Sequence, residues 1–287
     1  MEAHLSGQRY IDSHQHFWHI ARGDYAWMTP EKESIARDFM PDDLRPHLDA
    51  AGIHHTVTVQ AAATAAETDF ILDIAAGTDM VAGVVGWVDM ESPAASDMIA
   101  DLAARPKLCG IRPIIHDIPD DDWMLQEILT PAYRAIVEHG LTFDALVFPK
   151  HLKNLLTILD RHPDLQCVVD HCAKPHVRDG AFDDWAADMA TVASETAALC
   201  KLSGLATEAA PGWNADTVRP YIEHLIECFG PERMMWGSDW PVVTLAGTYA
   251  EWREASVQVL ATLDQAARDA IFGGTAIRFY GLEETIG

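Results

Sequence analysis

The stretch "YIDSHQHFWH", residues 10–19, places two histidines where they could do chemistry. His14 and His16 are separated by one residue at the end of an apolar run that favours a β-strand. Because alternate residues of a strand point to the same face, both imidazoles reach one shared point. Imidazoles bind zinc and transfer protons near neutral pH, whereas a histidine-rich turn is the alternative interpretation of the same residues.

Two later segments supply partners for this pair. His171 ends the run "VVDH", and Asp239 lies in "GSDWP". Each segment alone is typical of ordinary structure, either a buried strand histidine or a turn with a capping aspartate. Together with His14 and His16 they form a set of imidazoles and one carboxylate, which suits one divalent metal, zinc above all, with water completing the coordination sphere. Asp239 and His171 are also the candidate catalytic residues, with Asp239 as the base.

Eight short apolar runs alternate with longer amphipathic stretches, so the sequence predicts strands and helices in turn. Several runs are almost continuously hydrophobic, which is typical of parallel strands buried on both faces. Eight strand–helix repeats in about 250 residues have the length and rhythm of an α/β protein of the (β/α)8 TIM-barrel type. No linker divides residues 1–287, so we expect a single domain. The predicted strands are residues 9–14, 55–61, 81–89, 108–115, 141–148, 165–171, 199–205 and 233–239.

A doubly wound open sheet is the alternative architecture. It would need a glycine-rich nucleotide fingerprint after the first strand, and the sequence there is "DSHQHF". A barrel instead predicts polar residues at the carboxyl ends of several strands, where its loops carry the chemistry. Such residues follow or end most of the predicted strands: His14, His16, Gln60, Trp87, Asp89, Arg112, His116, Asp170, His171, Lys201, Ser203, Ser238 and Asp239.

The composition excludes several classes of partner. The chain has 44 acidic and 20 basic residues, a formal charge of −24, and such a surface repels nucleic acids and anionic membranes. No apolar run approaches the ~20 residues that span a bilayer, and "MEAHLSGQRY" shows no secretory signal. The five cysteines form no C-x-x-C pair, as expected for reduced thiols. We therefore expect a cytoplasmic protein without nucleic-acid or membrane partners.

Longer motifs resemble the amidohydrolase superfamily, and within it the lactonase-like branch called amidohydrolase family 2. The likeness runs over nearly the whole chain and is most specific in "IDSHQHFW", "VVDHCAKP", "KLSGLATEA" and "GSDWPV". Members of this branch are (β/α)8 barrels that use water to open sugar-acid lactones such as L-fucono- or L-rhamnono-lactone. The resemblance thus implies a lactonase with a small sugar lactone as substrate.

The resemblance carries the metal-binding motifs onto His14, His16, His171 and Asp239. Many superfamily members have a further lysine or histidine ligand on strand five, where this sequence reads "FDALVFPKH". The resemblance therefore implies one divalent metal at most, and some lactonases of this branch work without a tightly bound metal. Fuconolactonase-like members often have Arg-His on strand four, where this chain has "GIRPII", which argues against L-fucono-lactone in particular.

Several residues are candidates for binding the substrate. Arg112 suits a carboxylate or hydroxyl groups because its guanidinium binds oxygens bidentately, although a salt bridge inside the barrel is equally consistent. Lys174 either contacts a substrate oxygen or pairs with Asp170. The further candidates, for hydrogen bonds or for stacking on a sugar ring, are Gln60, Ser203, Glu208, Trp27 and Trp123.

Other features leave alternatives open. A decarboxylase or an amide or ester hydrolase would use the same scaffold, and a non-catalytic barrel is a different class altogether. A serine hydrolase is disfavoured because the sequence has no G-x-S-x-G motif. The chain could be a monomer or a homodimer. We expect the remaining histidines of interest to lie in surface or loop positions, although His116 stays a candidate for the site. These histidines are His19, His54, His55, His116 and His151.

Overall fold

All eight predicted strands are present in the computed structural model, which describes residues 9–287. They form one parallel sheet in the order β1 to β8. The expectation of no secretory signal rests largely on residues 1–8, which lie outside the described part. The strands are β1 (Ile11–Gln15), β2 (His55–Val59), β3 (Val81–Gly86), β4 (Leu108–Ile111), β5 (Thr142–Ala145), β6 (Cys167–Val169), β7 (Leu199–Leu202) and β8 (Met234–Trp236).

The sheet closes into a barrel just after β8, where the chain pairs with β1. The backbone N–H of Asp239 donates to the carbonyl of His14 over 2.8 Å, and that of His16 donates to the carbonyl of Trp240 over 2.7 Å. A parallel bridge joins Gln15 to Trp240. The hydrogen bonds that close the barrel therefore also hold three of the predicted site residues side by side. This confirms the (β/α)8 barrel.

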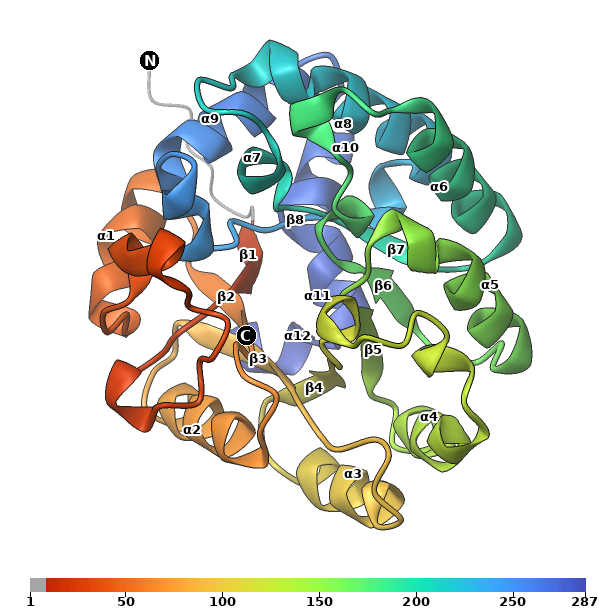
Figure 1. Cartoon of the computed structure of the whole chain (residues 1–287). Helices are drawn as coiled ribbons and strands as arrows, with labels where there is room; N and C mark the ends of the chain where they lie inside the picture. The colour runs from red at the N-terminus through yellow and green to blue at the C-terminus, as the bar shows by residue number, and fades with distance from the viewer. Residues whose placement is uncertain (1–8) are drawn as a thin grey trace.

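The helices surround the barrel, as Figure 1 shows. The strands are shorter than the predicted ones, and Arg112 lies just past β4 rather than within it. The α-helices are α1 (Pro41–Ala51), α2 (Ala65–Ala76), α3 (Ala95–Ala103), α4 (Thr130–Glu138), α5 (Leu152–Arg161), α6 (Asp183–Glu195), α7 (Leu205–Glu208), α8 (Ala215–Phe229), α9 (Tyr249–Leu260), α10 (Gln265–Asp269), α11 (Thr275–Tyr280) and α12 (Glu283–Ile286).

The C-terminal helices close the amino-terminal end of the barrel. Ala276 and Tyr280 of α11, with Leu282, pack against apolar residues such as Ile11 and Val57 from the first half of the strands. In Figure 1, α11 and α12 lie behind the strands. With this end filled by apolar side chains, the carboxyl ends of the strands are left for polar chemistry.

Two composition-based expectations concern the cysteines and membranes. All five cysteines are free thiols, of which Cys228 is partly exposed and the other four are buried. Over the described residues, none of the helices has the length and apolar character needed to cross a bilayer.

Candidate active site

A pocket of about 310 Å³ opens at the carboxyl ends of the strands. Its volume is at the lower end of the range for small-molecule sites. Positive side chains are unusually frequent in its lining for so acidic a protein, which makes it a site for electron-rich groups such as carbonyls and hydroxyls. The lining residues are His16, Trp27, Lys32, Ala61, Arg112, Ile114, His116, Asp117, Leu146, Phe148, His171, Lys174, Asp239 and Val242.

Three of the predicted metal ligands converge on this pocket, and we call His16, His171 and Asp239 the pocket donors. Asp239 Oδ1 lies 3.3 Å from His16 Nε2 and 3.9 Å from His171 Nε2. His16 Nδ1 donates its proton to the carbonyl of Val59 over 2.7 Å, and its Nε2 faces Asp239. His171 Nδ1 is 2.8 Å from the hydroxyl of Ser203, which can accept the ring proton in the same way.

The backbone around these donors is in rarely used conformations. Asp239 has a φ of 57°, and the four residues from His171 to Lys174 all have φ between 51° and 58°. Left-handed backbone costs a non-glycine residue roughly 1–2 kcal/mol, and such strain collects at functional sites. Gly204 allows the close approach of His171, because a Cβ there would lie 2.7 Å from the histidine Cβ. The chain is thus held in costly conformations where the donors meet.

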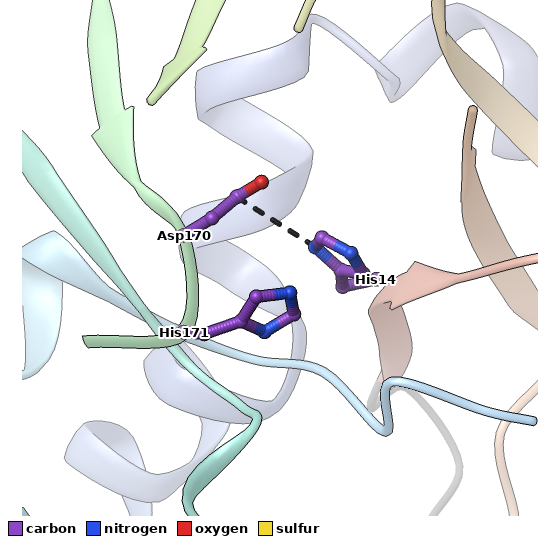
Figure 2. Close-up of side chains that lie close together, drawn as sticks. All are labelled: His14, Asp170 and His171. Carbon is purple, nitrogen blue, oxygen red and sulfur yellow. Dashed lines mark ion pairs between the residues drawn. The ribbon is translucent and has the colours of Figure 1, made fainter. Parts of the chain in front are cut away.

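His14, the fourth predicted ligand, lies below the pocket and is completely buried. Its ring is 4.9 Å from that of His16 and 4.4 Å from that of His171, measured between centroids. Figure 2 shows it facing Asp170, whose Oδ1 is 3.6 Å from His14 Nδ1. Gly237 makes room for this histidine, since a Cβ there would lie 2.7 Å from the His14 Cβ.

Beneath the pocket donors lie four charged residues that we call the inner ion cluster: Asp144, Asp170, Lys201 and Arg112. Lys201 Nζ is 2.6 Å from Asp144 Oδ2 and 3.0 Å from Asp170 Oδ1. Arg112 pairs with Asp170 Oδ2 at 3.3 Å. Tyr280 of α11 donates to Asp144 over 2.7 Å. Two positive and two negative charges therefore balance inside the barrel, and all four side chains are almost inaccessible to water.

These contacts shift the protonation equilibria of the buried groups. Burial lowers the pKa of His14 well below its usual value, and the charge of Lys201 lowers it further, so the ring is neutral. Burial and the neighbouring His14 likewise hold the pKa of His171 well below the usual range. For Asp170, burial raises the pKa, but Lys201, His14 and Arg112 together bring it well below the usual value. The imidazoles of His14 and His171 are therefore neutral at neutral pH.

The donor set fits a divalent metal. Two overlapping groups bring ligand atoms within 4.8 Å of one another, His14 with His16 and Asp239, and His14 with Asp170 and His171. The 3.3 Å between His16 Nε2 and Asp239 Oδ1 matches the edge of a tetrahedron of ligands around zinc, about 3.3 Å for bonds of about 2.05 Å. A lone pair facing a carboxylate oxygen also needs a cation or a proton between them.

Three predicted substrate-binding residues line the pocket. Arg112 does so while also forming the salt bridge to Asp170 that was its alternative role. Trp27 lies in the pocket wall, with its indole N–H donating to the carbonyl of Ala61 over 2.7 Å. Lys174 also lines the pocket, but its ion pair, at 2.6 Å, is with Glu208 and not with Asp170.

The remaining four candidates lie around the pocket rather than in its lining. Glu208 holds Lys174, and Ser203 holds the His171 ring. Gln60 is buried and fixes Arg112. The Gln60 side-chain amide donates to the backbone carbonyl of Arg112 over 2.8 Å, and the Arg112 guanidinium donates to the backbone carbonyl of Gln60. Trp123 lies in a neighbouring pocket, where its indole N–H donates to Glu91 over 2.7 Å.

Two of the histidines expected at surface or loop positions, His116 and His151, lie in loops after strands but are not on the surface. His116 lines the pocket, and its Nδ1 is buried without a hydrogen-bond partner among the described residues. Burial, with Lys174 and Arg112 nearby, lowers its pKa to about 3. His151 is fully buried and accepts a hydrogen bond from the backbone of Phe148. Both follow strands, and their proximity to other strand ends is a tertiary property that periodicity does not reveal.

Sequence reasoning gave no role to several further residues. Lys32 and Phe148 line the pocket from loops, where no pattern singles them out. Asp144 and Lys201 are single charged residues within apolar strands, and the interruption of hydrophobicity was the one available signal. Their partnership across 57 residues is visible only in the folded chain.

A parallel barrel with imidazoles after β1 and β6 and a carboxylate after β8 defines a hydrolase of the amidohydrolase type. The sequence matches the model of the amidohydrolase family over residues 11–282. The chain therefore belongs to this family.

Individual relatives are similar over nearly their full lengths. The chain is 43% identical to an L-fucono-1,5-lactonase of Burkholderia ambifaria, covering 96% of this chain and 97% of the relative. It is 34% identical to an L-fucono-1,5-lactonase of Burkholderia multivorans, covering 96% of each. The crystal structure of a Burkholderia multivorans amidohydrolase with bound zinc superposes with a TM-score of 0.90 at 33% identity, covering 95% of this chain and 99% of that one.

Proposed function

We propose that this protein is a lactonase that opens the ring of a sugar-acid lactone with water, and that L-fucono-1,5-lactone is its leading substrate. The observation that carries the proposal is the Asp239 carboxylate on the pocket floor, 3.3 Å from His16 Nε2. Support for the substrate comes from the 43% identity to a lactonase of that name. This identity outweighs the argument from Pro113, which stands where related lactonases often have histidine.

The reaction needs a base, a group that polarises the carbonyl and a proton for the leaving oxygen. Asp239 accepts a proton from the attacking water, whose oxygen bonds to the carbonyl carbon. The bond between that carbon and the ring oxygen then breaks, and Asp239 passes the proton to the leaving alkoxide. Arg112 and the neighbouring imidazoles face the region where the oxyanion develops, which stabilises it.

A divalent metal such as zinc, held by the histidine and aspartate cluster, would polarise the carbonyl and acidify a bound water. The chain's own residues have separate tasks. Trp27 offers an apolar ring face to the sugar, and Lys174 offers a positive charge to its oxygens. Ser203 keeps the His171 ring oriented.

The test is acid release from a panel of aldonolactones, followed with a pH indicator, for the parent and for Asp239→Asn. Each turnover produces a carboxylic acid, so lactone opening acidifies the solution. We expect the fastest opening with L-fucono-lactone or L-rhamnono-lactone and a loss of about 10³-fold in Asp239→Asn. If no aldonolactone is opened but carbon dioxide is released from an aromatic acid, the proposal is wrong and a decarboxylase takes its place.

A further inference from the structure

Three of the side chains that line the pocket, those of Lys32, Arg112 and Lys174, carry a positive charge, and two of them are paired with a carboxylate. Arg112 pairs with Asp170 at 3.3 Å, and Lys174 pairs with Glu208 at 2.6 Å. Neither carboxylate is part of the pocket lining. Each carboxylate therefore offsets the charge that its partner offers to a ligand without occupying the space inside the pocket.

Lys32, the third cation, has no such partner. Its Nζ donates to the backbone carbonyl of Trp27 over 3.1 Å and lies 4.9 Å from the centre of the Trp27 ring. Within residues 9–287, no carboxylate forms an ion pair with Lys32. An ammonium group has three N–H donors. Two N–H groups and an uncompensated positive charge therefore remain for a ligand in the pocket.

The segment between β1 and α1 holds Lys32 in this position. Lys32 lies in a short 3-10 helix, Pro30–Ile35. Trp27, which accepts the hydrogen bond from Lys32, donates in turn through its indole N–H to the carbonyl of Ala61, just after β2. The ammonium group is thus fixed against the pocket wall, and this preorganisation lowers the entropy lost when a ligand binds to it.

An uncompensated positive charge distinguishes the two sides of the proposed reaction. The lactone is neutral, whereas opening its ring with water gives a carboxylate. The pocket has a volume of only about 310 Å³, which keeps that carboxylate within about one Debye length of Lys32, about 8 Å at physiological ionic strength. Because salt screens the two charges only incompletely at this separation, their attraction favours the opened acid over the lactone.

We propose that Lys32 is the binding residue that makes the pocket prefer the sugar-acid anion over the neutral lactone, so that the product of the reaction inhibits it. The inference rests on the proposed function, because it takes the ligand to be an aldonate. It gives a role to a residue that the sequence patterns did not single out. Lys174 differs from Lys32 because Glu208 already offsets its charge.

The test is direct binding of two ligands that differ at one carbon atom, measured by titration calorimetry on the full-length protein. L-fuconate has a carboxylate where L-fucitol has a neutral CH2OH group, so the ratio of the two dissociation constants reports the preference for the anion. We expect the parent to bind L-fuconate at least about tenfold more tightly than L-fucitol. Lys32→Met should lower this ratio by about tenfold.

Three further variants separate the charge from packing. Lys32→Arg keeps the positive charge and should keep the ratio within about threefold of the parent value. Glu208→Gln removes the carboxylate that offsets Lys174 and should raise the ratio. Lys153→Met, a change to an exposed lysine on α5 outside the pocket lining, is the matched control and should leave the ratio unchanged. Added sodium chloride should lower the ratio in the parent, which tests the attraction without any substitution.

The proposal is overturned if Lys32→Met keeps the parent ratio, or if the parent binds L-fuconate no more tightly than L-fucitol. Lactone turnover is assayed separately. Turnover by the parent together with an unchanged ratio in Lys32→Met would contradict this inference alone. A ratio that depends on Lys32 in a protein that opens no lactone would contradict the lactonase proposal and leave the pocket as a sugar-acid binding site.

Discussion

The pocket donors and the inner ion cluster lie next to each other inside one barrel, but they differ in what their polar side chains are paired with. In the inner ion cluster, Lys201 is shared between Asp144 and Asp170, and Tyr280 adds a further hydrogen bond. Among the pocket donors, His16 Nε2 lies 3.3 Å from Asp239 Oδ1, and His171 Nε2 lies 3.9 Å from the same oxygen. Opposite charges fix the arrangement of the inner ion cluster, whereas the pocket donors line the pocket, where a ligand can reach them.

The largest effect is expected when the ammonium group of Lys201 is removed from the inner ion cluster. Lys201→Met leaves Asp144 and Asp170 buried without their shared cation, which should lower the free energy of unfolding by about 3–5 kcal/mol. Urea denaturation measures this. Lys150→Met is the matched control, because Lys150 pairs with Asp121 in an exposed position and should change stability by less than about 1 kcal/mol. Equal effects of the two variants would contradict the role given to Lys201.

How far the sequence predicts these two regions differs for a physical reason. Strands and strand ends follow from local patterns of apolar residues, so the amino-acid sequence alone predicts that His14, His16, His171 and Asp239 lie near one another, as they do. Lys201 and Asp144 could not be paired, because a lone charge in an apolar strand does not identify its partner. Trp123 was misplaced for a similar reason, since its loop turns it toward Glu91 and a neighbouring pocket.

A second prediction uses a buried carboxyl that supports the pocket wall from outside. Glu67 accepts from Tyr25 over 2.9 Å and from the backbone of Ala61, a pocket residue. Burial raises the pKa of Glu67 to about 7. The folded protein thus holds this proton up to a higher pH than the unfolded chain, so the group's contribution to stability falls as pH rises from about 4.5 to 7.

Glu67→Gln removes that ionisation and should flatten this pH dependence. Relative to the parent, we expect the variant to gain stability with rising pH, by up to roughly 2–3 kcal/mol between pH 4.5 and pH 8. Thermal unfolding across this range measures the difference. The account of Glu67 fails if the gap between variant and parent does not change with pH.

A third prediction concerns the support of a pocket donor. Ser203→Ala removes the hydroxyl at 2.8 Å from His171 Nδ1 and should lower kcat/KM for lactone opening by about 10–100-fold, as losses of such partners do. Ser194→Ala, whose hydroxyl bonds only the carbonyl of Thr191 on α6, is the comparison variant. Identical rate constants for the two would show that the orientation of His171 does not depend on Ser203.

The smallest expected effect comes from comparing the two tryptophans that the sequence proposes for stacking on the sugar, Trp27 and Trp123. Trp27→Phe alters the pocket wall and should raise KM by about fivefold, corresponding to about 1 kcal/mol of ring contact. Trp123→Phe changes the neighbouring pocket and should leave KM within about twofold. Steady-state kinetics with the best lactone measures KM for both variants. A larger increase in KM for Trp123→Phe than for Trp27→Phe would place the sugar in the neighbouring pocket instead.

The most direct test of the division between the two regions is a matched pair of aspartate variants, each assayed for lactone turnover and for unfolding free energy. Asp239→Asn should lose about 10³-fold in kcat and keep the stability of the parent within about 1 kcal/mol. Asp170→Asn should lower the unfolding free energy by about 3 kcal/mol or more, because Lys201 and Arg112 lose a charged partner. Full turnover in Asp239→Asn, or undiminished stability in Asp170→Asn, would contradict the account.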